Sequence, residues 1–386
     1  MDNSLSATDR AWVELNMENL EHNINEFRSI IPKTTEVMAV VKANAYGNGA
    51  IPISKFLNSI GITNFAVATL QEGIELRQNG IVGNILILGY TDITELESVI
   101  KYNLIQTIVD FNYAKKIESL TLSDKINVHL KINTGLNRIG ENYNNIDNFI
   151  KMFNMTNLNI LGCYSHLGVA DSLDNGDIEF TKNQIQNFDF CINKIKEAGC
   201  NPGKLHIQNT YGTLNYNNLR YDYVRIGIGI YGVFNNIIHE NNSKTLIHLK
   251  PVLALKARVT SIHKLHKNDS VSYGRNFVAS KNTTIAAVSI GYADGYPRAL
   301  YNKNINVLVN SKWAKIIGTI CMDQLIIDIS DIPNISVGNI VTLIGDNDKI
   351  SVENLSYKSN SISNELLCRF GSRLPRLICK NRRCIK

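Results

Sequence analysis

Hydrophobic residues along the first 230 positions alternate between two spacings. Residues 17–31 carry Leu20, Ile24, Phe27 and Ile31 at the spacing of an amphipathic helix, whereas residues 36–42 form a nearly continuous apolar run, as a buried parallel strand does. The alternation continues, with strands predicted at 65–69, 84–88, 105–109, 126–132, 159–166, 204–208 and 223–229 and helices at 51–60, 70–79, 94–102, 113–120, 146–153 and 180–198. About eight strand–helix units fit between residues 35 and 240, which favours a closed (β/α)8 TIM-like barrel over an open doubly wound sheet.

The pattern changes near residue 250. A polar segment, 239–251, ends in Pro251 and is typical of a linker. Short strands are predicted after it at 253–263, 284–290, 305–309, 314–317, 324–329 and 340–344, with helices only at 352–355 and 361–368. We therefore predict an α/β chain in which a barrel domain (10–245) precedes a mainly β C-terminal domain (250–386).

Composition excludes several classes of protein. The 386 residues are enough for two domains, and 44% hydrophobic with 19% charged residues is ordinary for a globular chain. The net charge of +6 is spread along the chain, and the terminal basic residues Lys380, Arg382, Arg383 and Lys386 are typical of an exposed tail, so no nucleic-acid partner is expected.

Location and metal content are predicted from the same composition. The start of the chain is polar, unlike a secretory signal, and no apolar run reaches about 18 residues, so we expect no membrane contact. Seven cysteines without a C-x-x-C pair predict reduced thiols, a cytoplasmic location and no metal site. The alternative that the chain is the cytoplasmic domain of a longer membrane protein stays open.

Lys42 is the first candidate for chemistry. It lies in V-V-K-A-N-A-Y-G-N-G at 40–49, directly after a buried apolar run, and barrels keep their reactive groups at the carboxyl ends of strands. Partial removal from water lowers the pKa of a lysine and makes it nucleophilic. A lysine that extends to solvent from a strand end is the structural alternative, and local pattern alone does not decide between them.

This segment resembles the cofactor-lysine motif of the alanine racemase family, whose members are pyridoxal-phosphate (PLP) enzymes of fold type III. Further segments match in order: K-I-N-T-G-L-N-R-I-G at 131–140, S-H-L at 165–167, H-I-Q-N-T at 206–210, V-R-I-G-I-G-I-Y-G at 224–232, V-S-Y-G-R at 271–275, G-Y-A-D-G-Y-P-R at 291–298, G-T-I-C-M-D-Q at 318–324 and R-L-P-R at 373–376. Each motif is weak alone, but the ordered set spans nearly the whole chain. The resemblance implies the same two-domain fold, with a first strand at 11–16 that joins the C-terminal domain.

The resemblance also implies how PLP is held. Lys42 would carry the cofactor, and Arg225 would face the ring nitrogen, where a permanently charged guanidinium can donate a hydrogen bond but not a proton. His166 and His206 would order this arginine. The remaining cofactor-binding residues implied are Tyr46, Asn209, Thr210, Gly227 and Ile228, which together surround the phosphate.

Racemisation needs a proton donor and acceptor on each face of the α-carbon. The resemblance assigns Lys42 to the D-enantiomer and Tyr273 to the L-enantiomer, and a tyrosine with an ordinary pKa of about 10 has to be tuned downward to act as a base. Tyr273 and Met322 would reach the cofactor of a second subunit, which implies a homodimer with shared sites. The resemblance implies three substrate-binding residues, Arg138, Tyr292 and Met322, and a carbamylated Lys131 that steadies Arg138.

The sequence departs from the family pattern at three positions. Asn133 replaces an aspartate near Lys131, and Asn48 replaces a histidine in the lysine motif. Ser372 replaces a tyrosine that borders the phosphate and the substrate methyl, and we expect it to be a fourth substrate-binding residue. The serine/alanine racemases of vancomycin resistance also have a small polar residue at this position, so the chain resembles them here. Those proteins carry a membrane domain ahead of the racemase domain.

The expected function is therefore racemisation of alanine and of serine, supplying D-amino acids for peptidoglycan precursors. A strict alanine racemase is the main alternative, since a pocket discriminates by only about 1–3 kcal/mol per methylene-sized group. A fold-type III decarboxylase would lack Tyr273 and place a carboxylate at the position of Arg225. A PLP carrier would lack residues 250–386.

Overall fold

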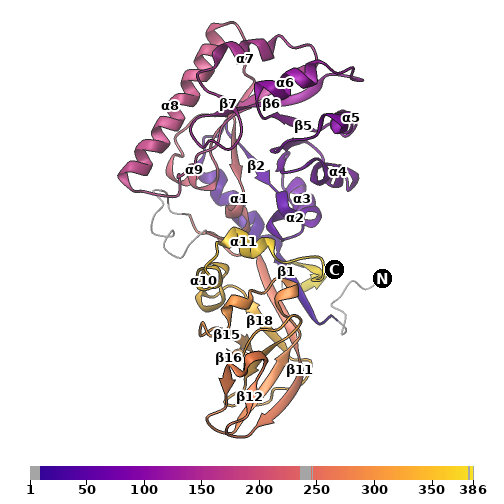
Figure 1. The fold of residues 1–386 in the computed structure, drawn as a ribbon, viewed down its shortest axis with the longest axis vertical. Helices are drawn as coiled ribbons and strands as arrows, with labels where there is room; N and C mark the ends of the chain where they lie inside the picture. The colour runs from indigo at the N-terminus through magenta and orange to yellow at the C-terminus, as the bar shows by residue number, and fades with distance from the viewer. Residues whose placement is uncertain (1–8, 235–244, 246, 381–382, 386) are drawn as a thin grey trace.

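The computed structural model describes residues 9–234, 245, 247–380 and 383–385, which form a parallel barrel and a β-rich domain (Figure 1). The barrel strands hydrogen-bond in the order β10 (Tyr223–Ile226), β2 (Glu36–Val40), β3 (Asn64–Val67), β4 (Asn84–Ile87), β5 (Ile105–Ile108), β6 (Ile126–Asn133), β8 (Leu158–Tyr164) and β9 (Lys204–His206). The two ends of this series meet, because the amide of Asp222 donates to Leu205 at 2.8 Å and that of Arg225 to Gln208 at 3.1 Å. The barrel is thus nearly closed, as predicted.

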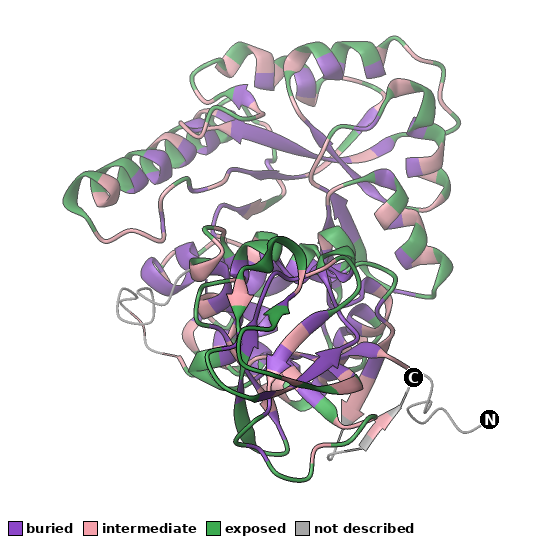
Figure 2. Ribbon diagram, turned by 60° about the horizontal axis from the view of Figure 1, so that its bottom comes forward, coloured by how far each residue is buried: buried purple, intermediate pink, exposed green. Residues whose placement is uncertain are grey.

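Helices cover the outside of the barrel strands. They are α1 (Met17–Ile30), α3 (Ala50–Ser59), α4 (Leu70–Gln78), α5 (Leu96–Lys101), α6 (Phe111–Glu118), α7 (Ile146–Phe153) and α8 (Asn175–Glu197), joined by the short α9 (Thr210–Asn215) after β9. Figure 2 shows buried strands inside and helices whose outer faces are exposed, the arrangement that their amphipathic patterns predict. Side-chain caps fix where several begin, as in α4, where Thr69 and Glu72 form a reciprocal capping box.

The second domain is built on a long mixed sheet. Its strands follow the order β14 (Thr283–Val288), β17 (Leu325–Asp328), β16 (Lys312–Ile317), β15 (Asn306–Val309), β18 (Ile340–Ile344), β11 (Leu253–Leu265), β1 (Ala11–Asn16), β19 (Arg376–Lys380) and β20 (Arg383–Ile385). β11 also pairs with β14, so part of the sheet closes on itself, and a register shift at Val259 bends β11 where this happens. β1 pairs with β11 and β19, which joins the start of the chain to the second domain.

Short elements complete the domain and connect it to the barrel. They are the hairpin β12 (Ser270–Val271) and β13 (Phe277–Val278), helices α10 (Val352–Lys358) and α11 (Ser363–Cys368), and the two-residue β7 (Glu141–Asn142) beside β6. One hydrophobic core runs through both domains, so they pack as one body. The predicted boundaries at 245 and 250 stay a prediction, and most of the predicted linker, 239–244 and 246, lies outside the described residues.

Three local expectations differ from the structure. Of the predicted basic tail, Lys380 and Arg383 belong to β19 and β20, whereas Arg382 and Lys386 lie outside the described residues. Within this hairpin Cys379 and Cys384 are a cross-strand pair with Cα atoms 4.0 Å apart and form a disulfide, so the prediction that all cysteines are reduced was wrong for this pair. Finally, α8 begins at Asn175, five residues before the predicted start at residue 180. Among the described residues, no helix is both long and apolar enough to span a membrane.

Candidate active site

A left-handed turn follows the first barrel strand. The sequence predicts a strand up to Lys42, but β2 ends at Val40 and Lys42 begins the short helix α2 (Lys42–Tyr46). Its residues 43–46 have φ between 51° and 54°, a conformation that L-residues avoid at a cost of about 1–2 kcal/mol each. The turn is held by the amide of Ala45, which donates to Val41 at 2.8 Å, and by that of Gly47, which donates to Ala43 at 3.0 Å. Such strain is concentrated at functional sites, and here it directs Lys42 and Tyr46 into one cavity.

The cavity has a volume of about 490 Å³ and lies at the carboxyl ends of the barrel strands. Residues at or near the ends of β2, β6, β8 and β10 line it (Val40, Lys131, Tyr164 and Arg225), as do residues that follow β3, β4 and β9 (Ala68, Leu88 and Asn209), and α11 adds Asn364 from the second domain. Of the predicted site residues, ten line it: Lys42, Tyr46, Lys131, Arg138, His166, Asn209, Thr210, Arg225, Gly227 and Ile228.

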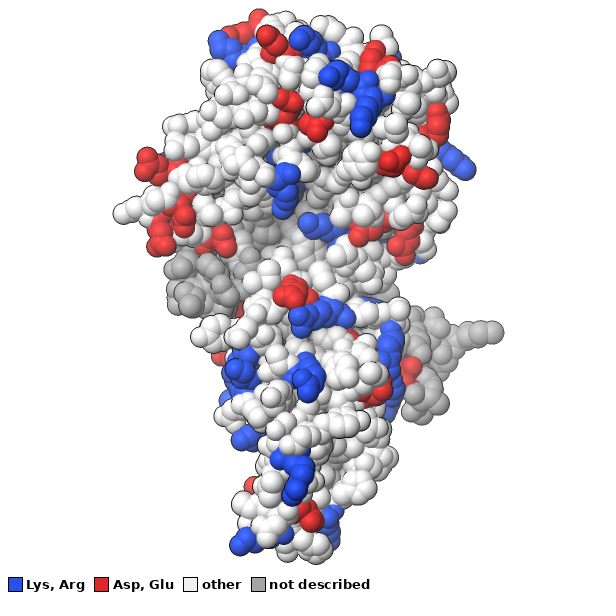
Figure 3. Space-filling view, viewed as in Figure 1, with Lys and Arg blue, Asp and Glu red and all other residues white. Residues whose placement is uncertain are grey.

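The charged groups of the cavity are all cations. Lys42, Lys131, Arg138 and Arg225 line it, and no aspartate or glutamate does among the described residues. Figure 3 shows a hollow between the two domains, with basic groups on its barrel side and an acidic group next to a basic one on the other side. Burial, and then the neighbouring Arg138, lower the pKa of Lys42, while burial with Arg225 and Arg138 lowers the pKa of Lys131 to about 7. The site is therefore suited to an anionic ligand and offers amines that can lose their protons.

Arg225 is fixed by neutral acceptors. Its Nη1 lies 2.6 Å from Nδ1 of His206, and its Nη2 donates to the carbonyl oxygens of Ser165 at 2.7 Å and Ile207 at 3.0 Å. Nη2 also lies 3.2 Å from Nδ1 of His166. Burial, followed by the charge of Arg225, lowers the pKa of both histidines, so they accept hydrogen bonds as neutral rings. Arg225 thus keeps its charge without a carboxylate beside it.

Hydroxyl groups and backbone amides meet at the other end of the cavity. The amide of Gly227 donates to Oγ1 of Thr210 at 3.2 Å, and an added Cβ on Gly227 would lie 2.6 Å from the hydroxyl of Tyr46. The position therefore has to be glycine for Tyr46 to lie against the backbone. Asn209 caps α9 by accepting from the amide of Gly212 at 2.8 Å, which orients the start of that helix. Neutral donors arranged in this way suit a phosphate group.

Four predicted site residues lie away from this cavity within one chain. Tyr273, Tyr292 and Met322 are 74%, 41% and 53% exposed, and Ser372 is exposed in the loop before β19. Tyr273 lies in η4 (Tyr273–Arg275), between β12 and β13, and Tyr292 lies in η5 (Tyr292–Asp294), after β14. The amide of Tyr292 donates to Cys321 at 3.1 Å, which places η5 beside the loop that carries Met322.

Comparison with known proteins identifies the family. A family model described as the alanine racemase N-terminal domain matches residues 15–235, and one described as the alanine racemase C-terminal domain matches residues 252–378. The chain belongs to the alanine racemase family. An alanine racemase of Nostoc sp. is 38% identical and aligns over 96% of each chain, and a solved structure of alanine racemase from Clostridium difficile superposes with a TM-score of 0.91 at 32% identity over 98% of each chain. A serine/alanine racemase of Enterococcus gallinarum is 38% identical over 95% of this chain and 51% of its own. The chain spans about half the length of the Enterococcus relatives that it matches.

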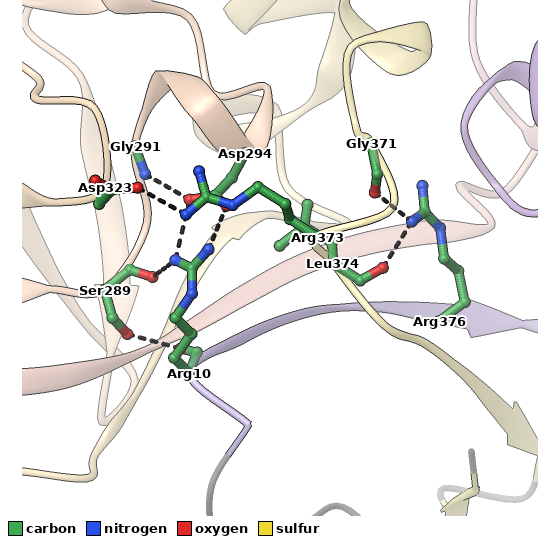
Figure 4. Close-up of polar contacts among 9 residues, drawn as sticks. All are labelled: Arg10, Ser289, Gly291, Asp294, Asp323, Gly371, Arg373, Leu374 and Arg376. Carbon is green, nitrogen blue, oxygen red and sulfur yellow. Dashed lines mark hydrogen bonds and ion pairs between the residues drawn. The ribbon is translucent and has the colours of Figure 1, made fainter.

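The resemblance to the family did not indicate a charge cluster, built around the buried Asp294, that joins the exposed loops of the second domain (Figure 4). Asp294 is fully buried and accepts from both terminal nitrogens of Arg10, with Nη1 at 3.1 Å from Oδ2. Nε of Arg373 lies 3.4 Å from Oδ1 of Asp294, and its Nη2 donates to Asp323 at 2.7 Å. The cluster therefore connects the loops that carry Tyr292, Met322 and Ser372. The only sequence signal was an acidic residue within the G-Y-A-D-G-Y motif.

A second missed residue is His129, in β6. It is 2% exposed, and its Nδ1 lies 2.8 Å from Nε2 of His206. A histidine in an apolar strand is usually a core residue, so its sequence context gave no reason to select it.

Proposed function

We propose that this chain is a PLP-dependent racemase that interconverts L- and D-alanine, with Lys42 and Tyr273 as its two bases. The observation that carries the proposal is the cavity itself, where a lysine of lowered pKa shares the space with three other cations and a set of neutral phosphate donors. An enzyme that binds an anionic aldehyde and an amino-acid carboxylate needs this combination.

The residues present fit PLP. Tyr46, Thr210 and the amides of Gly227 and Ile228 would hold the phosphate, and the missing side chain at Gly227 leaves the space for the hydroxyl of Tyr46. Asn209 would support them by ordering the start of α9. Lys42, at the beginning of the left-handed turn, would bind the cofactor covalently.

Arg225 would face the ring nitrogen. When bound, PLP draws electrons away from the α-carbon of the attached amino acid and so makes the α-proton acidic. Arg225 can donate an N–H to the ring but has no proton to give up at neutral pH. Because burial and the charge of Arg225 lower the pKa of its partners His166 and His206, these rings stay neutral and do not supply it with a proton. This favours brief removal and return of the α-proton over side reactions.

The two bases would act on opposite faces of the α-carbon. Burial lowers the pKa of Lys42, which makes its neutral form available to take a proton at Nζ. The hydroxyl of Tyr273 would do the same on the other face. Since Tyr273 is 74% exposed and does not line the cavity of its own chain, we propose a homodimer in which each subunit completes the site of the other. Met322 and Tyr292 would reach the same site.

A mixing experiment tests the shared site. Lys42→Ala and Tyr273→Phe proteins, each inactive, are unfolded and refolded together with PLP. In a shared-site dimer, random pairing gives heterodimers with one intact site, so about a quarter of the wild-type activity should return. If each chain forms a complete site, mixing restores nothing. Either variant refolded alone is the control.

Lys131 is the proposed site of carbamylation. Its pKa of about 7 leaves a neutral amine whose nitrogen can attack the carbon of CO2, with loss of one N–H proton to solvent. The resulting anion would offset the charge of Arg138, which would then hold the substrate carboxylate. A carbamate signal in the ¹³C spectrum of protein incubated with ¹³C-bicarbonate, absent from Lys131→Met, tests this; no difference between the two would refute it.

Serine is proposed as a second substrate. Support comes from the similarity to the serine/alanine racemase of Enterococcus gallinarum and from Ser372, a small hydroxyl residue. We further propose that the D-amino acids supply peptidoglycan precursors, including those of vancomycin resistance. Chiral analysis of L-alanine and L-serine, each incubated with PLP-loaded protein, decides the substrate: conversion of alanine alone would show a strict alanine racemase.

A further inference from the structure

His129 lies inside the barrel, beyond the residues that the proposed reaction uses. It projects from β6 and is 2% exposed, and His206, from β9, is fully buried beside it. Nδ1 of His129 and Nε2 of His206 are 2.8 Å apart, while the opposite nitrogen of His206 lies 2.6 Å from Nη1 of Arg225. The three side chains form a continuous hydrogen-bonded row that ends at the cavity.

The direction of each hydrogen bond in this row follows from Arg225. A guanidinium only donates, so Nδ1 of His206 has to accept and carry no proton. A neutral His206 then carries its proton on Nε2, and this N–H donates a hydrogen bond to Nδ1 of His129. His129 is in turn unprotonated on Nδ1 and carries its own proton on Nε2. Burial, reinforced by the charge of Arg225, lowers the pKa of His129 to about 3, so the row contains neutral rings at any working pH.

The surroundings fix both rings in place. The ring of His206 stacks on Tyr164 with centroids 4.8 Å apart and planes 4° apart, and it meets Tyr223 edge-on at 5.7 Å. The hydroxyl of Tyr164 lies 2.9 Å from that of Thr107. Gly162 makes room for His129, since a Cβ there would lie 2.9 Å from Nε2 of the ring. Neither imidazole can therefore find another partner by a simple rotation.

We propose that His129 is a positioning residue. It accepts a hydrogen bond from Nε2–H of His206 and so keeps Nδ1 of His206 unprotonated, where it accepts from Arg225. Without this acceptor, His206 would either bury an unpaired N–H or move its proton to Nδ1, where it would point at a donor. Both outcomes loosen the anchor of Nη1. The consequence for catalysis rests on the proposed function of Arg225 at the cofactor ring, whereas the tautomer of His206 does not.

Two substitutions distinguish the loss of the hydrogen-bond acceptor from the loss of the ring's volume. His129→Asn removes the ring but keeps an oxygen near the position of Nδ1, and His129→Leu fills similar space without an acceptor. His263, exposed in β11, provides the matched control His263→Leu. Each protein is labelled with ¹⁵N-histidine and studied as the PLP-loaded full chain and without PLP, and the visible absorption of bound PLP and kcat/KM for L-alanine are measured in parallel.

The wild-type spectrum should show His206 protonated on Nε2 only, with or without cofactor. His129→Asn should keep this pattern and lose less than about threefold in kcat/KM. His129→Leu should change the pattern, shift the absorption of bound PLP and lose about 10- to 100-fold in kcat/KM, a loss typical of removing the outer hydrogen-bond partner of a site histidine. A wild-type His206 protonated on Nδ1 would overturn the inference even if the leucine variant fails to fold. So would a leucine variant with the wild-type pattern, absorption and activity. Failure of wild-type protein to racemise would instead overturn the proposed function and leave the tautomer to decide this inference.

Discussion

Gly227→Ala should weaken the binding of PLP through Tyr46. The added Cβ would lie 2.6 Å from the hydroxyl oxygen and 3.2 Å from Cζ of Tyr46, closer than carbon atoms approach such groups. Tyr46 cannot easily withdraw, because its ring is buried and packs against Tyr231 with centroids 5.3 Å apart. The hydroxyl therefore has to leave its place beside the backbone amides.

The expected size follows from the hydrogen bond that is lost. A hydrogen bond to a charged group contributes about 1.5–3 kcal/mol, which corresponds to a rise of about 10- to 150-fold in the Kd of PLP. The assay is titration of the protein without cofactor by PLP, followed by the visible absorption of the bound form, so it does not depend on activity. Tyr46→Phe should give a similar rise.

Gly176→Ala is the matched control, because a Cβ on Gly176 meets nothing within 4 Å. It should leave the Kd unchanged. If Gly227→Ala binds PLP as tightly as wild type while its circular dichroism spectrum is unchanged, the hydroxyl of Tyr46 is not a phosphate donor and this part of the site is wrongly assigned.

Two further predictions concern stability. Asp294→Asn removes the charge that Arg10 and Arg373 share and should lower the free energy of unfolding in urea by about 2–3 kcal/mol, below the range for fully buried pairs because both arginines are partly exposed. Glu365→Gln, in a surface pair with Arg369, should lower it much less, and equal losses in the two variants would contradict the role given to Asp294. Burial lowers the pKa of Lys131 from 10.5 to about 7 in the folded chain, so the unfolded chain binds more protons between these values and stability should rise with pH there by up to about 1.4 kcal/mol per unit. Lys131→Met in CO2-free buffer should remove the contribution of this lysine to the slope, and an unchanged slope would show that its pKa is not lowered in the folded chain.

Pattern alone predicted the barrel because its strands are buried on both faces and its helices carry one apolar face. It failed where local preference is overridden. Residues 43–46 are helix-compatible or neutral in sequence, yet they are left-handed, and the carbonyl of Leu367 in the second domain lies against Gly47 directly after them. β19 and β20 were missed because β19 pairs with β1, which is more than 350 residues away in the chain, and β20 pairs in turn with β19.

Some residues of the candidate site could likewise be predicted from the sequence and others could not. Lys42 could be selected from its position after a strand, but Tyr273 is one of 16 tyrosines and only the resemblance to a family distinguished it. Asp294 and His129 were not found because their roles depend on partners that are distant in sequence: Arg10 and Arg373 for one, His206 for the other. Partners that are so far apart along the chain form no motif of fixed spacing, so the sequence alone does not reveal these networks.

The most direct test of the central claim is the fate of the α-proton of L-alanine. PLP-loaded protein is incubated with L-alanine in D2O, with Lys42→Ala as the blank. The enantiomers are then separated, and the deuterium content of each is measured by mass spectrometry. We predict D-alanine that carries deuterium at the α-carbon, formed only by the protein with Lys42. Bound PLP without any D-alanine, or equal conversion by Lys42→Ala, would contradict it.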